Sequence, residues 1–307
     1  MRTGIAFVIA ALALCVLGLT LSGQPLFSQA EAQYTGDEAC LECHEERQAD
    51  FANNPHHRAE LDPQLVAEKV GCESCHGPGS LHADANGDTE NPGYATIRIF
   101  KGLDAEAASA ACRTCHLSEE QMDWDHSPHS ANGVGCTDCH QVHQTGEALT
   151  SNLIAADNTA DLCLTCHQDK RASISRSGHM PIKEGGMDCA DCHNPHGTMN
   201  DHQLRAASNN DLCLTCHTDK RGPVLWEHPP VREDCLTCHE PHGSNSDKVL
   251  AAKRPYLCQS CHIATRHPST LYDLPDLESN RLFNRSCTNC HTQIHGSNHP
   301  SGSTFLR

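Results

Sequence analysis

Apart from one apolar segment near the start, the 307-residue chain has no long hydrophobic run. No stretch alternates apolar and polar side chains over the length that a sheet needs, and Asn-Pro, Gly-Pro, His-Pro-Pro and Gly-Gly breaks interrupt the polar remainder. Thr35-x-x-Glu38 has the form of a capping box, and Asp104 can cap an alanine-rich helix over residues 105–111. The pattern predicts short α-helices and loops with little or no β-sheet.

The apolar segment, residues 5–21, follows Arg2 and precedes small residues at Ala30 and Ala32, which is the layout of a secretory signal peptide. We expect residues 1–32 to be removed by cleavage near Ala30 or Ala32, leaving 33–307 as the mature domain. A retained membrane anchor is the alternative, although the run is barely long enough to span a bilayer. Export places the mature protein in the periplasm or beyond.

The chain downstream is too polar to build a core of its own. Only 4% of residues are aromatic, the mean hydropathy is -0.52, and the sequence holds 21 Gly and 16 Pro. A chain of this length and composition cannot bury enough apolar surface by itself. We therefore expect bound cofactors to supply most of the interior.

Cys-x-x-Cys-His occurs ten times, which uses 20 of the 21 cysteines and leaves Cys15 in the apolar segment. Two thiols at this spacing reach the edge of one porphyrin as thioethers while the next histidine rises beneath the iron, so the motif attaches haem c. Zinc ribbons and a disulfide framework are the alternatives, but tetrahedral zinc does not need a histidine after every second cysteine. The predicted attachment residues are Cys40, Cys43, Cys72, Cys75, Cys112, Cys115, Cys136, Cys139, Cys163, Cys166, Cys189, Cys192, Cys213, Cys216, Cys235, Cys238, Cys258, Cys261, Cys287 and Cys290. The predicted proximal iron ligands are His44, His76, His116, His140, His167, His193, His217, His239, His262 and His291.

The motifs group into five two-motif units, at about 36–95, 96–157, 158–207, 208–252 and 253–307. The third and fourth units are the most alike, since Asp-Leu-Cys-Leu-Thr-Cys-His recurs in both. A regular repeat predicts a linear array. The expected fold is a multihaem cytochrome c, in which short α-helices and loops wrap around a linear chain of ten haems.

Fourteen of the 24 histidines stand outside the motifs, and every unit has one between its motifs and one after the second. The predicted distal ligands are His56, His129, His179, His228 and His267 between motifs, and His82, His143, His196, His242 and His295 after them. His57 and His126 are alternatives to His56 and His129, which each follow an aromatic residue by five positions. His202 and His299 have no counterpart in other units and are expected at the surface.

A histidine three positions after a proximal one, as in His193-Asn-Pro-His196, cannot reach the far face of the same haem, because the two axial nitrogens stand about 4 Å apart across the iron. Such a histidine should serve a neighbouring haem. Methionine is the competing ligand, but Met122, Met180, Met187 and Met199 recur at no fixed place in the repeat. We expect ten bis-histidine, low-spin haems with no open iron and no catalytic residue.

The formal charge of -17 disfavours nucleic acid and anionic lipid as partners. Several segments carry a resemblance: Cys-His-Gly-Pro-Gly-Ser-Leu-His at 75–82, Trp-x-x-Ser-x-His at 124–129, Cys-His-x-Pro-His-Gly at 192–197 and 238–243, and Trp-Glu-His-Pro-Pro-Val at 226–231. On these the mature chain resembles the DmsE/MtrA family of periplasmic decahaem cytochromes. The resemblance implies insertion into an outer-membrane β-barrel porin and exchange of electrons with periplasmic carriers and a cell-surface cytochrome or terminal reductase.

Three functions are open at this point. The first is a barrel-inserted electron conduit, and the second is a soluble periplasmic shuttle that would share every haem motif. The third is a multihaem reductase, which needs an iron with a vacant position. All ten motifs end in histidine and four histidines are to spare, so the enzyme is the least favoured of the three.

Overall fold

The computed structural model describes residues 31–52, 54–59, 71–144, 152–262 and 286–306. The α-helices are α2 (Asp37–Leu41), α3 (Glu46–Ala52), α4 (Pro55–Ala59), α5 (Cys72–His76), α6 (Ser80–Asp84), α7 (Ala105–Cys112), α8 (Pro128–Ala131), α9 (Cys136–Cys139), α10 (Thr159–Cys166), α11 (Gln168–Ser173), α12 (Cys189–Cys192), α13 (Asn209–Cys213), α14 (Pro229–Glu233) and α15 (Tyr256–Gln259). The 3-10 helices are η2 (Pro92–Thr96), η3 (Glu119–Gln121), η4 (Trp124–His126), η6 (Asp201–Gln203), η7 (Thr218–Lys220), η8 (Cys235–Thr237), η9 (Asp247–Val249), η10 (Cys287–Asn289) and η11 (Gly302–Thr304). The expected fold of short helices and loops is confirmed. In these ranges the only extended pairing is a set of isolated β-bridges.

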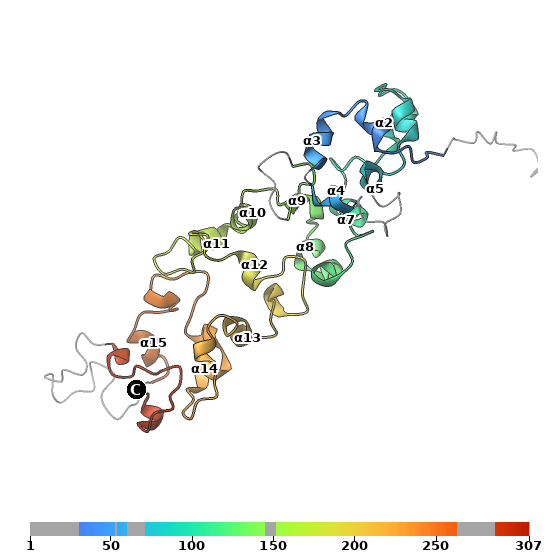
Figure 1. The fold of residues 1–307 in the computed structure, drawn as a ribbon. Helices are drawn as coiled ribbons and strands as arrows, with labels where there is room; N and C mark the ends of the chain where they lie inside the picture. Colours follow the sequence, from blue (N-terminus) through green and yellow to red (C-terminus); the bar gives the residue numbers. More distant parts are fainter. Residues whose placement is uncertain (1–30, 53, 60–70, 145–151, 263–285, 307) are drawn as a thin grey trace, which may run out of the picture.

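The elements follow one another along one direction in chain order (Figure 1). Helices α2, α3 and α5 lie at one end, α10 to α12 in the middle, and α15 with the C terminus at the other end. None of the helices in the described part of the chain is long and apolar enough to cross a bilayer. The predicted signal segment lies almost wholly outside the described residues.

Five attachment motifs in the described ranges begin on helices that a side chain caps, namely α7, α10, α12, α13 and η8. Asp104 Oδ1 accepts a hydrogen bond from Ala107 N (2.7 Å), which starts α7 and delivers Cys112, as predicted. The capping box at Thr35 is wrong, because the N-cap of α2 is Gly36 and makes no side-chain cap. Thr35 N–H instead donates to the buried Glu73 carboxylate (3.0 Å), which also collects Gly36 N–H (2.8 Å) and draws this segment onto α5.

Few hydrophobic side chains in the described ranges are buried, and most of them are small or isolated. They are Ala85, Ala108, Ala111, Trp124, Leu153, Leu164, Ile174 and Leu250. These residues are spread along the whole array rather than gathered in one place. The described part of the polypeptide thus holds its shape largely through local turns and hydrogen bonds.

Candidate haem-binding array

The ten motifs are neighbours in space in the order in which they occur in the sequence. Within each unit the thiols of the two leading cysteines lie close enough that one shifts the pKa of the other, and the pairs are Cys40–Cys72, Cys112–Cys136, Cys163–Cys189, Cys213–Cys235 and Cys258–Cys287. Between units the closing cysteine of one motif interacts with the first cysteine of the next, as in Cys75–Cys112, Cys139–Cys163, Cys192–Cys213 and Cys238–Cys258. The motifs therefore form one continuous line.

The close spacing of the cysteines shifts the pKa values of their thiols. Burial, followed by the neighbouring Cys235, raises the pKa of Cys213 to about 11. A hydrogen bond from the Cys112 thiol lowers the pKa of Cys136 to about 6. A thioether has no proton to lose, so in the haem-bound protein these shifts matter only as a measure of how closely the attachment points lie.

Seven of the ten motif histidines face a second imidazole in the described part of the chain. The ring-centroid distances are 5.9 Å for His116–His56, 6.2 Å for His76–His143, 6.2 Å for His167–His129, 6.0 Å for His140–His196, 6.0 Å for His193–His242, 6.1 Å for His262–His228 and 6.2 Å for His239–His295. Two nitrogens bound to one iron at about 2 Å each place the ring centroids about 6 Å apart. The pairs therefore have the spacing that a bis-histidine haem requires.

The pairs follow one rule. The proximal histidine of a first motif faces the between-motif histidine of the preceding unit, as His116 faces His56. The proximal histidine of a second motif faces the last predicted distal ligand of the following unit, as His140 faces His196. Adjacent units thus exchange histidines in both directions, so every such pair joins two units.

The remaining predicted ligands are not brought together in this way. His179 Nδ1 donates to Arg176 O (2.6 Å), while its Nε2 lies 3.1 Å from Glu184 Oε1, and this hydrogen bond raises the pKa of His179. His82 Nδ1 donates to Tyr94 O (2.7 Å). Within the described ranges, His44 and His217 are the motif histidines that face no second imidazole. His267 lies outside the described residues.

The alternative histidines have other surroundings. The ring of Phe51 lies 5.8 Å from that of His57, whereas His56 faces a motif histidine. His126 is an exposed residue of η4. His202 is exposed and contributes only its backbone carbonyl, which accepts from His193 Nδ1 (2.8 Å).

Backbone carbonyls orient the imidazoles, a feature that sequence reasoning missed. His76, His140, His193 and His239 each donate Nδ1–H to a carbonyl 9 to 22 residues downstream, at 2.7 to 3.0 Å. A donor at Nδ1 leaves Nε2 as the metal-binding nitrogen. No side-chain type marks a carbonyl acceptor, so no motif could have revealed it. His196 Nδ1, by contrast, is buried without a hydrogen-bond partner among the described residues.

The joints between units are narrow because a glycine follows the exchanged histidine. Gly197, Gly243 and Gly296 have φ of +108°, +130° and +123°, and a Cβ on Gly197 would lie 2.6 Å from Asp123 O of the preceding unit. Beside two of these glycines, isolated bridges pair Gly178 with Ser244 and Trp226 with Ser297. Only glycine fits this contact, which explains the His-Gly dipeptides.

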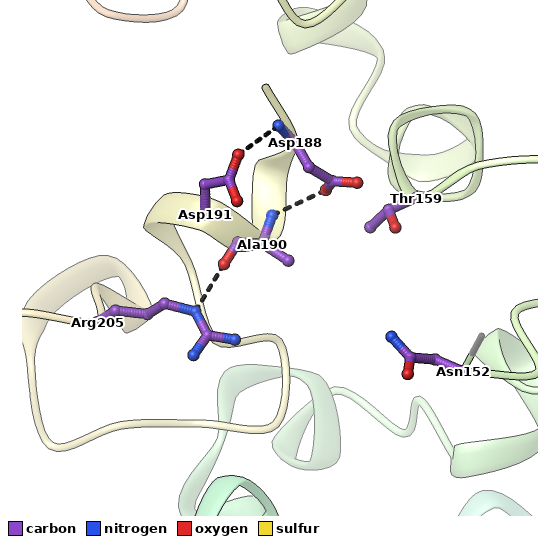
Figure 2. Close-up of a pocket in the computed structure, with 6 residues that line it drawn as sticks. All are labelled: Asn152, Thr159, Asp188, Ala190, Asp191 and Arg205. Carbon is purple, nitrogen blue, oxygen red and sulfur yellow. Dashed lines mark hydrogen bonds between the residues drawn. The ribbon is translucent and has the colours of Figure 1, made fainter. Parts of the chain in front are cut away.

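A polar cavity of 520 Å³ opens between the second and third units and is lined by Asn152, Thr159, Asp188, Ala190, Asp191 and Arg205 (Figure 2). Arg205 Nε donates to Ala190 O (2.6 Å), and its guanidinium forms an ion pair with Glu120 (2.8 Å) that lowers the pKa of Glu120. The cavity flanks the motifs and contains none of the facing imidazoles. In the described ranges, no three His, Cys, Asp or Glu side chains gather at the spacing of a metal site.

Attachment motifs in a continuous line, with imidazoles facing each other across a haem-sized gap, define a multihaem c-type cytochrome. Residues 126–172, 179–222 and 228–267 match the family of the doubled CXXCH motif. The chain is 38% identical over 288 residues to the multiheme cytochrome MtrA of Shewanella baltica (strain OS185), covering 91% of this chain and 84% of that one. The protein belongs to the MtrA family of multihaem cytochromes.

A second comparison is with a solved structure, the undecaheme cytochrome from the S-layer of Carboxydothermus ferrireducens. The identity is 21%, the coverage is 78% of this chain and 32% of that one, and the TM-score is 0.13. The three doubled-motif matches are shifted by one motif relative to the five units defined above. Each match contains the second motif of one unit and the first motif of the next. Either grouping describes the same unbroken line.

Proposed function

We propose that this protein conducts electrons through ten covalently attached bis-histidine haems, and that it does so across the outer membrane inside a β-barrel porin. Haem supplies reversible one-electron chemistry at iron. The observation that carries the proposal is the set of imidazole pairs about 6 Å apart along one line of motifs. The polypeptide holds neighbouring cofactors close together because it exchanges ligands between units.

The pairing rule also suggests ligands for the irons at His44, His217 and His291. His179 should bind the iron at His217, since it occupies the between-motif place of the third unit. We assign His82 to the iron at His44 and His267 to the iron at His291, which gives every haem two histidines.

Ferric EPR tests the ligand count. The expected spectrum of the purified holoprotein contains low-spin signals only, because every iron has two imidazole ligands. Mass spectrometry of the mature chain should give ten haems in the same sample. A high-spin signal of one spin per protein would contradict the complete bis-histidine set and favour a multihaem reductase.

The location and the partner rest on the MtrA family and on the apolar segment of residues 5–21, which we assign to a signal peptide cleaved near Ala30 or Ala32. The elongated array suits a route from a periplasmic carrier on one side of the membrane to a cell-surface cytochrome or terminal reductase on the other (Figure 1). The proposed conduit is an electron carrier and has no catalytic site of its own.

Detergent extraction of outer membranes from the native host distinguishes the conduit from a shuttle. We expect the haem-staining band to co-purify with an integral β-barrel protein through two chromatography steps. An abundant soluble periplasmic protein serves as the control for carry-over. Recovery of all the haem protein in the soluble periplasmic fraction would replace the conduit with the diffusing shuttle, and the haem assignments would stand.

A further inference from the structure

In three of the five units, the chain after the second motif makes one recurring turn, which we call the return loop. Its defining contact is the hydrogen bond from the proximal Nδ1 to a loop carbonyl, at 2.8 Å for His140 to Asn152 O, 2.8 Å for His193 to His202 O and 3.0 Å for His239 to Lys248 O. His291 donates to Thr304 O in the same manner at the end of the chain.

Two backbone hydrogen bonds fasten each return loop to its motif. In the fourth unit Glu240 N donates to Val249 O (2.7 Å) and Ala251 N donates to Cys238 O (2.9 Å). The same two bonds recur as Gln141 to Leu153 and Ala155 to Cys139, and as Asn194 to Gln203 and Arg205 to Cys192. The carbonyl that meets the imidazole is therefore held from both sides.

The residue directly after that carbonyl has a left-handed backbone, although it is not glycine. The φ angles are +52° for Leu153, +56° for Gln203, +50° for Val249 and +54° for Phe305. Left-handed backbone is unfavourable for L-residues, most of all for β-branched valine, and persists only where the surroundings impose it. The same unfavourable geometry at the same place in four units indicates a shared purpose.

The angle between the two imidazole planes of a facing pair is constant where a left-handed residue is present. The three facing pairs whose proximal histidine has a return loop with a left-handed residue, His140–His196, His193–His242 and His239–His295, are each inclined by 17°. The pair His76–His143 is inclined by 33°, and there the accepting Arg98 O is not followed by a left-handed residue. The three first-motif pairs, His116–His56, His167–His129 and His262–His228, are inclined by 83°, 68° and 22°, so the angle varies where the left-handed residue is absent.

We propose that the left-handed residue of each return loop is a positioning residue, which fixes the plane of the proximal imidazole and lowers the reduction potential of its haem. The proposal rests on haem binding as proposed above. A hydrogen bond at Nδ1 makes the imidazole a stronger electron donor, which favours ferric iron. Second-motif haems then differ from first-motif haems in a repeating pattern along the array.

Val249→Pro in the full-length holoprotein tests this directly. Proline fixes φ near -65°, so the peptide group between Lys248 and residue 249 must turn away and the carbonyl leaves His239. We expect one tenth of the spectroelectrochemical amplitude to move to higher potential. In EPR, one rhombic low-spin signal should change, because the angle between imidazole planes sets the splitting of the iron d orbitals.

Val249→Gly is the matched control, since glycine adopts positive φ freely. Its titration and EPR spectrum should equal those of the wild type, and a proline variant with ten haems and unchanged spectra would overturn the proposal. If the purified wild-type protein instead contained no haem, the proposed function itself would be refuted.

Discussion

Replacing His228 with alanine is expected to turn one haem in ten from low spin to high spin. The His228 ring lies 6.1 Å from that of His262 at an inclination of 22°, so the affected haem is the one attached at Cys258 and Cys261. Loss of this imidazole leaves the iron with one protein ligand and raises its potential. Electron transfer through the array should slow, because every electron must pass this site. Ferric EPR and stopped-flow oxidation of the reduced protein measure the two effects.

His202→Ala is the matched control for this variant. The His202 side chain is exposed, and the hydrogen bond that His193 makes to residue 202 uses only the backbone carbonyl. The ferric EPR spectrum and the rate of electron transfer of this variant should equal those of the wild type. Identical low-spin spectra for the His228 and His202 variants would refute the assignment of His228 and direct attention to the other histidines of the fourth unit.

The attachment motifs and the fold class were predictable because their signals are local. Five residues contain the whole Cys-x-x-Cys-His motif, and Asp104 caps α7 from the adjacent position. The cap predicted at Thr35 was wrong for the opposite reason. Glu73, which is 38 positions away, binds the Thr35 N–H and outcompetes the local pattern.

The pairing of imidazoles could not be predicted, because it depends on contacts between backbones of different units. The bridge from Gly178 to Ser244, and the Pro195 carbonyl that accepts from His129 Nδ1 (2.8 Å), involve backbone groups that every residue carries. His196 faces His140 rather than His193, which agrees with the expectation that a histidine so close to a proximal one serves another haem. That expectation could not say that the exchange would run both ways between the same two units.

This exchange makes each joint a shared support for two haems. The bridge between Gly178 and Ser244 lies beside both His179 and His242, which point to different neighbours in the proposed scheme. A defect at one joint should therefore disturb two irons and leave distant ones unchanged. We therefore expect the array to be cooperative over neighbouring units, as in other repeat proteins.

Gly243→Ala tests this cooperativity, and we expect it to cost roughly 3 kcal/mol of unfolding free energy. Gly243 has φ of +130°, and a Cβ there would collide with the carbonyl oxygen of Ser173. To relieve the collision the third and fourth units must separate, which withdraws His242 from His193. The expected spectrum gains high-spin signal from one or two haems, the second being the haem at His217 if His179 moves as well. Guanidinium titrations followed at the Soret band report the stability.

Gly185→Ala separates backbone strain from the joint. Gly185 also has positive φ, at +70°, but a Cβ there meets nothing within 4 Å. Alanine at this site should therefore cost only about 1 kcal/mol for its backbone conformation and leave every haem low spin. The difference in unfolding free energy between the two variants measures the contact of residue 243 with Ser173 alone. Equal losses of stability with unchanged spectra would show that the glycine joint does not hold the exchanged ligands, and that the haems themselves keep the units together.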